Sequence, residues 1–184
     1  MSIINGQSNE SDQSFGLASS LEVVATKSQQ EILDLGPSAF LWNGDDLPRN
    51  VGSPPSGYVT KTFMTQWRRG VDQPGYMSFG PYFETGGSVG SIFKIRWIMS
   101  IDNRGGPEED VLTVDCVDFK AGGRDLFPPT TFKVKQFPVN SDGFIVFSRR
   151  EVELKAGMSI ETRVFARGGA SLSLYQLRYD ATFL

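Results

Sequence analysis

The clearest feature of this chain is an alternation of apolar and polar residues that starts near residue 58 and continues to the end. In the segment SIFKIRWIMSI, at 91–101, Phe, Ile, Trp, Met and Ile occupy every second position from 93 onward. Lys94, Arg96 and Ser100 fall between them. Successive side chains of a strand point to opposite faces, so this segment is predicted to be a half-buried strand.

Similar short segments follow one another, separated by Gly, Pro, Asn or Asp, at spacings near ten residues. The expected strands are YVTKTFM, YMSFGPYF, SIFKIRWIMSI, DVLTVDCVDF, TTFKVKQF, GFIVFS, REVELK, MSIETRVFAR and SLSLYQLRYDATFL. Eight or nine short strands without α-helical periodicity between them are typical of an all-β domain. The sequence therefore predicts a mainly β fold, an antiparallel β-sandwich or jelly roll, with an extended N-terminal arm.

Two local irregularities are expected in the last third of the chain. Lys155, Ala156 and Gly157 separate two alternating segments and predict a tight hairpin, with Gly157 free to adopt a positive φ. In the final segment the apolar positions change parity near Tyr175 and Gln176. A β-bulge there would insert one residue and return the apolar side chains to the core.

The first 57 residues lack this regular alternation. Residues 1–20 are rich in Ser, Asn, Gln and acidic residues, with Phe15 and Leu17 among few apolar ones, and are expected to form a flexible arm. Residues 21–57 should contain two short strands, SSLEVVAT and EILDL, followed by a long connection at 36–57. A capped helical turn starting in SQQE, just before EILDL, is an equally open reading. The β-domain itself is expected at 58–184.

The long connection contains the run Phe40-Leu41-Trp42, which is expected to fasten it to the domain. Loops of this length are uncommon unless they are functional or held by a neighbour. Phe40 and Trp42, together with Phe15 and Leu17 of the arm, are therefore candidates for contacts with other subunits.

Charge and composition exclude several classes of function. The formal net charge is −3, and the 18 Lys and Arg residues are scattered, so the dense positive footprint of a nucleic-acid-binding protein is missing. The apolar stretches are far shorter than the roughly 20 residues of a membrane-spanning helix. The N-terminal sequence lacks the pattern of a secretory signal. We expect a soluble protein that is used without export, with neither nucleic acid nor membrane as partner.

Catalytic residues are also scarce. The chain has no histidine, which removes the commonest general base and the usual zinc-binding nitrogen. Its one cysteine, Cys116, alternates with polar residues and is expected to be a small buried side chain. The acidic loop at 102–110 is interpreted as a polar hairpin loop rather than a calcium site, because its spacing does not match an EF-hand. We expect no enzymatic activity, no cofactor and no metal.

Aromatic rings and guanidinium groups cluster between residues 67 and 83, in a segment broken by Gly and Pro. The candidate interface or ligand residues there are Trp67, Arg68, Arg69, Tyr76 and Tyr82. Trp, Tyr and Arg supply much of the energy at protein interfaces, and aromatic faces also suit apolar sugar surfaces. The third reading, in which these aromatics fill the sandwich core, also remains open.

The C-terminal segment VELKAGMSIETRVFARGGASLSLYQLRYD resembles the closing strands of carbohydrate-binding-module jelly rolls. The strand rhythm over 58–184 also resembles the small jelly-roll proteins that decorate or cement the heads of tailed bacteriophages. The second resemblance implies a structural protein of the virion, made in the host cytoplasm. It would form a homo-oligomer, expected to be a trimer, and contact other virion proteins such as the major capsid protein. The alternative is a glycan- or receptor-binding module of a phage spike or tail fibre, with a surface glycan as ligand.

Overall fold

A computed structural model describes residues 21–27, 40–53, 64–85, 91–137 and 144–182. Eleven strands and one short 3-10 helix lie in this part of the chain. The strands are β1 (Leu21–Lys27), β2 (Phe40–Asn43), β3 (Thr65–Trp67), β4 (Gly75–Ser78), β5 (Phe83–Glu84), β6 (Ser91–Asp102), β7 (Asp110–Asp118), β8 (Arg124–Lys133), β9 (Phe144–Leu154), β10 (Ser159–Ala166) and β11 (Ser171–Thr182); the helix is η1 (Val134–Gln136).

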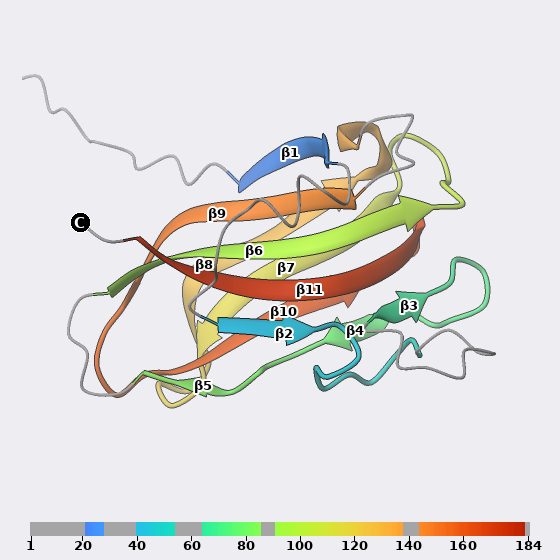
Figure 1. Ribbon diagram of the computed structural model, residues 1–184. Coiled ribbons are helices and arrows are strands. Elements are labelled where there is room, and N and C mark those ends of the chain that lie inside the picture. Colours follow the sequence, from blue (N-terminus) through green and yellow to red (C-terminus); the bar gives the residue numbers. More distant parts are fainter. Residues whose placement is uncertain (1–20, 28–39, 54–63, 86–90, 138–143, 183–184) are drawn as a thin grey trace, which may run out of the picture.

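The strands form two antiparallel sheets packed face to face (Figure 1). The larger sheet has the order β1-β9-β6-β11-β2, with β3 also paired to β11 beyond the end of β2. The smaller sheet has the order β4-β10-β7-β8, with β5 also paired to β10. This arrangement confirms the predicted mainly β fold and is that of a β-sandwich. The jelly-roll connectivity stays a prediction.

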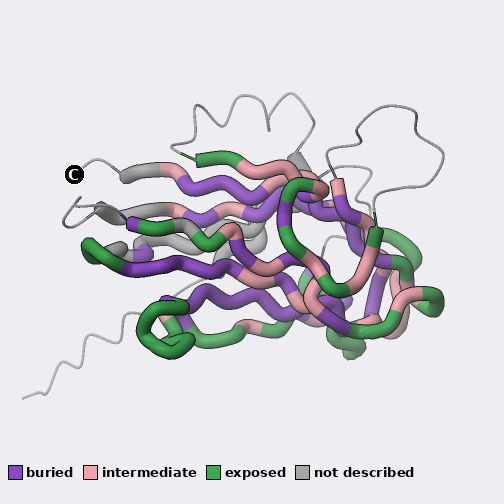
Figure 2. The backbone as a smooth tube through the Cα atoms, turned by 90° about the horizontal axis from the view of Figure 1, so that it is seen from below, coloured by how far each residue is buried: buried purple, intermediate pink, exposed green. Residues whose placement is uncertain are grey.

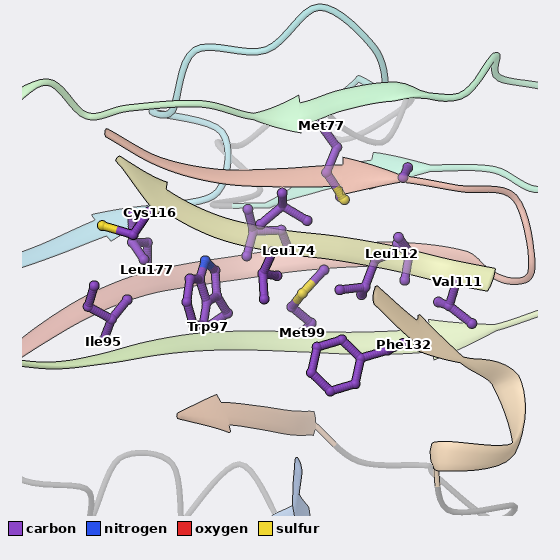
Figure 3. Close-up of a cluster of buried hydrophobic side chains, with 14 of the residues drawn as sticks. Met77, Ile95, Trp97, Met99, Val111, Leu112, Cys116, Phe132, Leu174 and Leu177 are labelled. Carbon is purple, nitrogen blue, oxygen red and sulfur yellow. The ribbon is translucent and has the colours of Figure 1, made fainter. Parts of the chain in front are cut away.

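The core lies between the two sheets (Figure 3). The large sheet contributes Ile95, Trp97 and Met99 from β6, all fully buried. Leu112 and Cys116 of β7 face them from the smaller sheet. Cys116 is buried and free of any disulfide, as the sequence predicted. The burial of these side chains supplies the main driving force for packing the sheets together.

One polar pair is enclosed in this apolar core. The hydroxyl groups of Thr162 and Tyr179 are hydrogen-bonded to each other between the sheets. Tyr179 is fully buried, and the loss of water around it raises the pKa of its phenol well above the ordinary value. The bond satisfies both hydroxyl groups, which would otherwise be costly to bury.

The predicted alternation in β6 is confirmed. Ile95, Trp97, Met99 and Ile101 are buried, whereas Lys94, Arg96 and Ser100 are only partly buried. Figure 2 shows buried residues concentrated along the strands and exposed ones in the turns. The predicted bulge in β11 is also confirmed, because its register with β6 shifts between Leu174 and Gln176.

Several predicted boundaries are wrong. Gly157 has the expected positive φ of 79°, but the turn before it joins β9 of the larger sheet to β10 of the smaller one, so no hairpin forms there. The segments GFIVFS and REVELK form the single strand β9, and the segment TTFKVKQF ends in η1 rather than as a strand. The connection predicted at 36–57 contains the strand β2. In each case tertiary pairing extends or divides a segment that local pattern alone leaves ambiguous.

Other predictions fall on residues outside the described part. These are the arm at 1–20 with Phe15 and Leu17, the segment EILDL with its alternative capped turn, and most of the segment YVTKTFM. The strand predicted in SSLEVVAT corresponds to β1, which pairs with β9. Both β1 and β2 thus belong to the same sheet as β9 and β11.

Candidate functional site

Trp67 lies in the core, not on a surface. It is 1% exposed, at the end of β3 in the larger sheet, and its indole N–H donates to the backbone carbonyl of Gln73 at 2.8 Å. The reading in which this aromatic fills the core is therefore confirmed, and Trp67 is not an exposed ligand contact. Its hydrogen bond satisfies the one polar atom of a large buried ring.

Arg68 and Arg69 are occupied by neighbours on the surface. The backbone amide and guanidinium of Arg68 donate to the carboxylate of Asp72. Arg69 donates to both carboxylate oxygens of Glu109 and to the carbonyl of Gly168. These contacts fasten the turn after β3 and the loop between β6 and β7, which is a structural role for both arginines.

Phe40 and Trp42 lie on the edge strand β2. Their rings are stacked with centroids 6.0 Å apart, and Trp42 also contacts the buried Tyr179 edge-on. Phe40 is 36% exposed and the neighbouring Leu41 is 45% exposed. Within the described residues, β2 pairs only with β11, so this strand presents apolar side chains at one edge of the larger sheet. Such an edge is a common docking surface for other chains.

Tyr76 lies on β4, on the outer face of the smaller sheet. In β10 the even-numbered positions from Ile160 to Ala166 are buried in the core, so the odd-numbered side chains point outward. We call this outer surface the smaller-sheet face; its described residues include Tyr76, Thr113, Asp115, Glu161, Arg163, Phe165 and Arg167. It is turned away from the viewer in Figure 1.

Arg163 and Asp115 form the centre of this face. The two residues are directly opposite each other on β10 and β7, and the guanidinium donates two hydrogen bonds to the carboxylate, at 2.6 and 2.8 Å. The hydrogen bond to Asp115 raises the pKa of Arg163 above its ordinary value. Arg163 also lies over the ring of Tyr76, 5.6 Å from its centroid. Paired donors and a ring contact hold this guanidinium in one orientation.

A second arginine, four residues further along the chain, is arranged in a similar way. Arg167 lies over the ring of Phe165, 4.6 Å from its centroid, and its Nε–H donates to the hydroxyl of Thr113. Thr113 is in turn hydrogen-bonded to Thr131 of β8. The rings of Phe165 and Tyr76 meet edge-on, 5.0 Å apart. The centre of the face is thus an alternating array of aromatic rings and guanidinium groups.

Glu161 differs from the other charged residues of the face. It is only 7% exposed, yet its carboxyl makes no hydrogen bond or ion pair within the described residues. Burial raises its pKa, Arg163 lowers it, and Asp115 raises it further. Glu161 thus contrasts with Asp115, whose carboxylate accepts two hydrogen bonds from Arg163.

Tyr82 lies at one end of this face, with Phe119. Their rings meet at 66° with centroids 5.2 Å apart, and they are 49% and 56% exposed. The neighbouring Lys120 and Glu84 form an exposed ion pair of 3.0 Å. Tyr82 and Tyr76 are therefore the two sequence candidates that the fold places on the smaller sheet, whereas Trp67 lies on the other one.

The acidic loop between β6 and β7 is held by ion pairs. Glu108 pairs with Lys135, and Asp110 pairs with Lys133. Glu109 accepts hydrogen bonds from the backbone amide of Gly106 and from Arg69, which lower the pKa of its carboxyl. No group of three or more potential metal ligands occurs in the described ranges. The loop joins the two sheets, so the hairpin expected from the sequence is wrong although its polar character is confirmed.

Sequence reasoning missed Arg163, Phe165 and Glu161. Their segment, MSIETRVFAR, was recognised as a strand, and its outward positions are Glu, Arg, Phe and Arg. A face of this composition is unusual for a solvated strand and could have been singled out. Asp115 required the structure, because only the register places it opposite Arg163.

This arrangement can bind, through ring faces, guanidinium donors and carboxylate acceptors held in fixed positions. Comparisons with protein-family models, with curated proteins and with solved structures each return no match. Within the described residues, no helix is long and apolar enough to cross a membrane.

Proposed function

We propose that this chain is a non-enzymatic structural protein of a virus particle, a decoration or cement protein that stabilises the head through contacts between subunits. In this proposal it forms a homo-oligomer and contacts the major capsid protein in the virion. The resemblance of its strand rhythm to small decoration proteins suggests the setting. The observation that carries the proposal is the exposed apolar edge formed by Phe40 and Leu41 on β2.

An edge strand offers unpaired backbone groups to a neighbouring chain, and isolated proteins usually protect such edges with charges, Pro or a covering segment. Here the edge instead presents a phenyl ring and an isobutyl group. Such a strand is suited to adding to a sheet of an adjacent subunit, where backbone hydrogen bonds supply affinity and side chains supply selectivity.

The test is co-sedimentation with the heads of the virus that encodes the chain, prepared without this protein. Leu41→Lys should reduce attachment at least 10-fold and leave the unfolding curve nearly unchanged, because Leu41 is half-exposed. Val71→Lys is the matched control, since Val71 is 62% exposed on the turn after β3, away from β2. Deleting residues 1–20, the expected arm, should also abolish attachment. Attachment of both altered proteins at the normal level would refute the proposal.

A second candidate function is glycan binding, favoured by the half-exposed rings of Tyr82 and Phe119 beside the ion pair of Glu84 and Lys120. Two rings at a steep angle can contact two sides of a sugar, and the charged groups can form hydrogen bonds with its hydroxyls. Tyr82→Ala should then abolish signals on a glycan array without changing stability. An array without signals for the unaltered protein would exclude this candidate.

A further inference from the structure

The charges on the smaller-sheet face are balanced in its middle and unbalanced at its two ends. In the middle, Arg163 and Asp115 neutralise each other through two hydrogen bonds. At one end, Glu161 makes no ion pair within the described part of the chain. At the other end, Arg167 uses only its Nε–H, toward Thr113, and its terminal nitrogens donate to no described residue.

These two unbalanced charges are spaced symmetrically. Glu161 lies three residues before Val164 on β10, and Arg167 lies three residues after Val164, directly beyond the end of that strand. At about 3.3 Å per residue each lies roughly 10 Å from Val164, in opposite directions along the strand. Rotation by 180° about an axis that lies along the surface, crosses β10 over Val164 and runs perpendicular to the strand would exchange the two positions.

We propose that the smaller-sheet face docks against the same face of a second copy of this chain, about a two-fold axis that passes over Val164. In such a dimer Arg167 of each copy faces Glu161 of the other. This inference deepens the proposed function, on which it rests for its biological setting, by naming the surface through which copies associate. It replaces the expected trimer, at this surface, with an isologous pair.

The neighbouring strands fit the same axis. On β8, Asp125 is paired with Val117, which lies three residues after Val114 on β7. Lys133 is paired with Asp110, which lies four residues before Val114. Val114 is the residue opposite Val164. The two-fold rotation therefore brings Lys133 of one copy, which pairs with Asp110 of its own chain, toward Asp125 of the other.

The dimer would also supply what Glu161 lacks. Glu161 is 7% exposed and receives no hydrogen bond from a described residue, and a guanidinium from the second copy would provide two donors. The rings of Tyr76 and Phe165 lie near the axis, at the centre of the contact, where aromatic residues contribute most to binding. The paired charges at the ends fix the orientation of the two copies.

The experiment is sedimentation velocity of the purified full chain, without particles. The unaltered protein should sediment as a dimer at micromolar concentration. Arg167→Glu and Glu161→Lys should each weaken dimerisation about 10-fold or more, because each places like charges together at both ends of the contact. A mixture of the two variants should restore dimers, since both cross-copy contacts then join opposite charges.

Circular dichroism and urea unfolding establish whether each variant folds. If Glu161→Lys does not, Asp125→Lys mixed with Lys133→Glu tests the same axis, and Asp125 is an exposed residue. Lys155→Glu is the control for charge reversal, because Lys155 is exposed in the turn between the sheets and should leave the dimer intact.

If the protein remained a monomer at concentrations up to about 100 µM, the Kd of any dimer would lie above that value, and the inference would be overturned. An oligomer that is insensitive to all four substitutions, including a trimer formed elsewhere, would also overturn it. Failure of the particle-attachment test with the dimer intact would instead remove only the proposed function.

Discussion

Each sheet carries an Arg–Asp pair on its outer face, and the two pairs differ in kind. On the smaller sheet, Arg163 donates two well-aligned hydrogen bonds to Asp115. On the larger sheet, the Nε of Arg96 lies 2.9 Å from an oxygen of Asp180. Neither that nitrogen nor either Asp180 oxygen has a hydrogen bond of good geometry among the described residues.

Strand register explains the difference. Arg163 and Asp115 are directly opposite on neighbouring strands. Arg96 is opposite Arg178, and Asp180 is opposite Lys94, so the carboxylate reaches Arg96 only diagonally. Like charges directly opposite in a sheet repel, whereas opposite charges directly opposite stabilise it. The same two residue types therefore form a bonded pair in one sheet and a purely electrostatic contact in the other.

Burial makes the charged group of Arg96, Arg178 and Asp180 on the larger sheet more costly to desolvate. Arg178 is almost completely buried, and this burial lowers the pKa of its guanidinium, with Asp180 opposing the shift and Arg96 adding to it. Asp180 thus lies near two guanidinium groups on one face. It compensates their repulsion without the directional bonds that orient Arg163.

The largest effect is expected from Asp115→Asn. The substitution removes the charge and one acceptor from the bonded pair and leaves Arg163 partly buried without its counter-ion. Unfolding in urea at neutral pH should show a loss of about 2 kcal/mol. In an Arg163→Met background the same substitution should cost much less. An equal cost in both backgrounds would show that the pair is not the source of the effect.

Asp180→Asn should cost less, about 1 kcal/mol, because no aligned hydrogen bond is lost and only the electrostatic attraction changes. The same urea measurement gives the ranking of the two sheets. A loss of stability greater than that of Asp115→Asn would mean that the electrostatic compensation of Arg96 and Arg178 by Asp180 contributes more than well-aligned hydrogen bonds do. The ranking of the two sheets would then be reversed.

The contact between Arg163 and the ring of Tyr76 should contribute about 0.5–1 kcal/mol, the range for a partly exposed cation–π pair. A double-mutant cycle with Tyr76→Leu and Arg163→Met measures this coupling. Among the described contacts, Arg96 of the larger sheet has no aromatic ring comparable to Tyr76. A coupling near zero would leave the bond to Asp115 as the whole reason for the orientation of Arg163.

The smallest effect is expected from Glu161→Gln, and its sign depends on pH. Burial raises the pKa of Glu161 in the folded state, so the folded chain holds this proton more tightly than the unfolded chain. This contribution to stability is present in acid and is lost as the pH rises through the raised pKa. Glu161→Gln should therefore remove this pH-dependent loss of stability and slightly stabilise the protein at neutral pH.

Urea midpoints from acid to neutral pH, measured in an Arg167→Glu background to keep the chain monomeric, test this sign. A clear destabilisation by Glu161→Gln at neutral pH in that background would show that the carboxylate already has a stabilising partner within its own chain.

Local alternation predicted the strands well because each strand buries one face, and burial imposes a period of two. It predicted the shift near Tyr175 for the same reason, since a core residue cannot change faces without an inserted residue. The predicted segment DVLTVDCVDF is confirmed as β7, although side chains of both its faces are buried, including those of Thr113 and Asp115. Local alternation failed to identify β2 within a segment rich in turn residues.

The candidate site was harder to predict. Trp67 and Tyr76 are nine residues apart and have the composition of a single binding patch, yet β3 and β4 belong to different sheets. The partners that orient Tyr76, namely Arg163 and Phe165, are nearly ninety residues away in the sequence. Aromatic composition alone does not distinguish a ring that fills the core from one that lies on a face.

The sequence by itself determined that this chain forms antiparallel strands with one buried face, and it located the bulge, because the period of burial is a local property. Only the tertiary structure decided which strands share a sheet and in what register they pair. Those two choices put Arg163 opposite Asp115 and Arg96 opposite Arg178, and they leave Glu161 without a bonded partner among the described residues. Contacts between strands depend on pairing across long sequence separations.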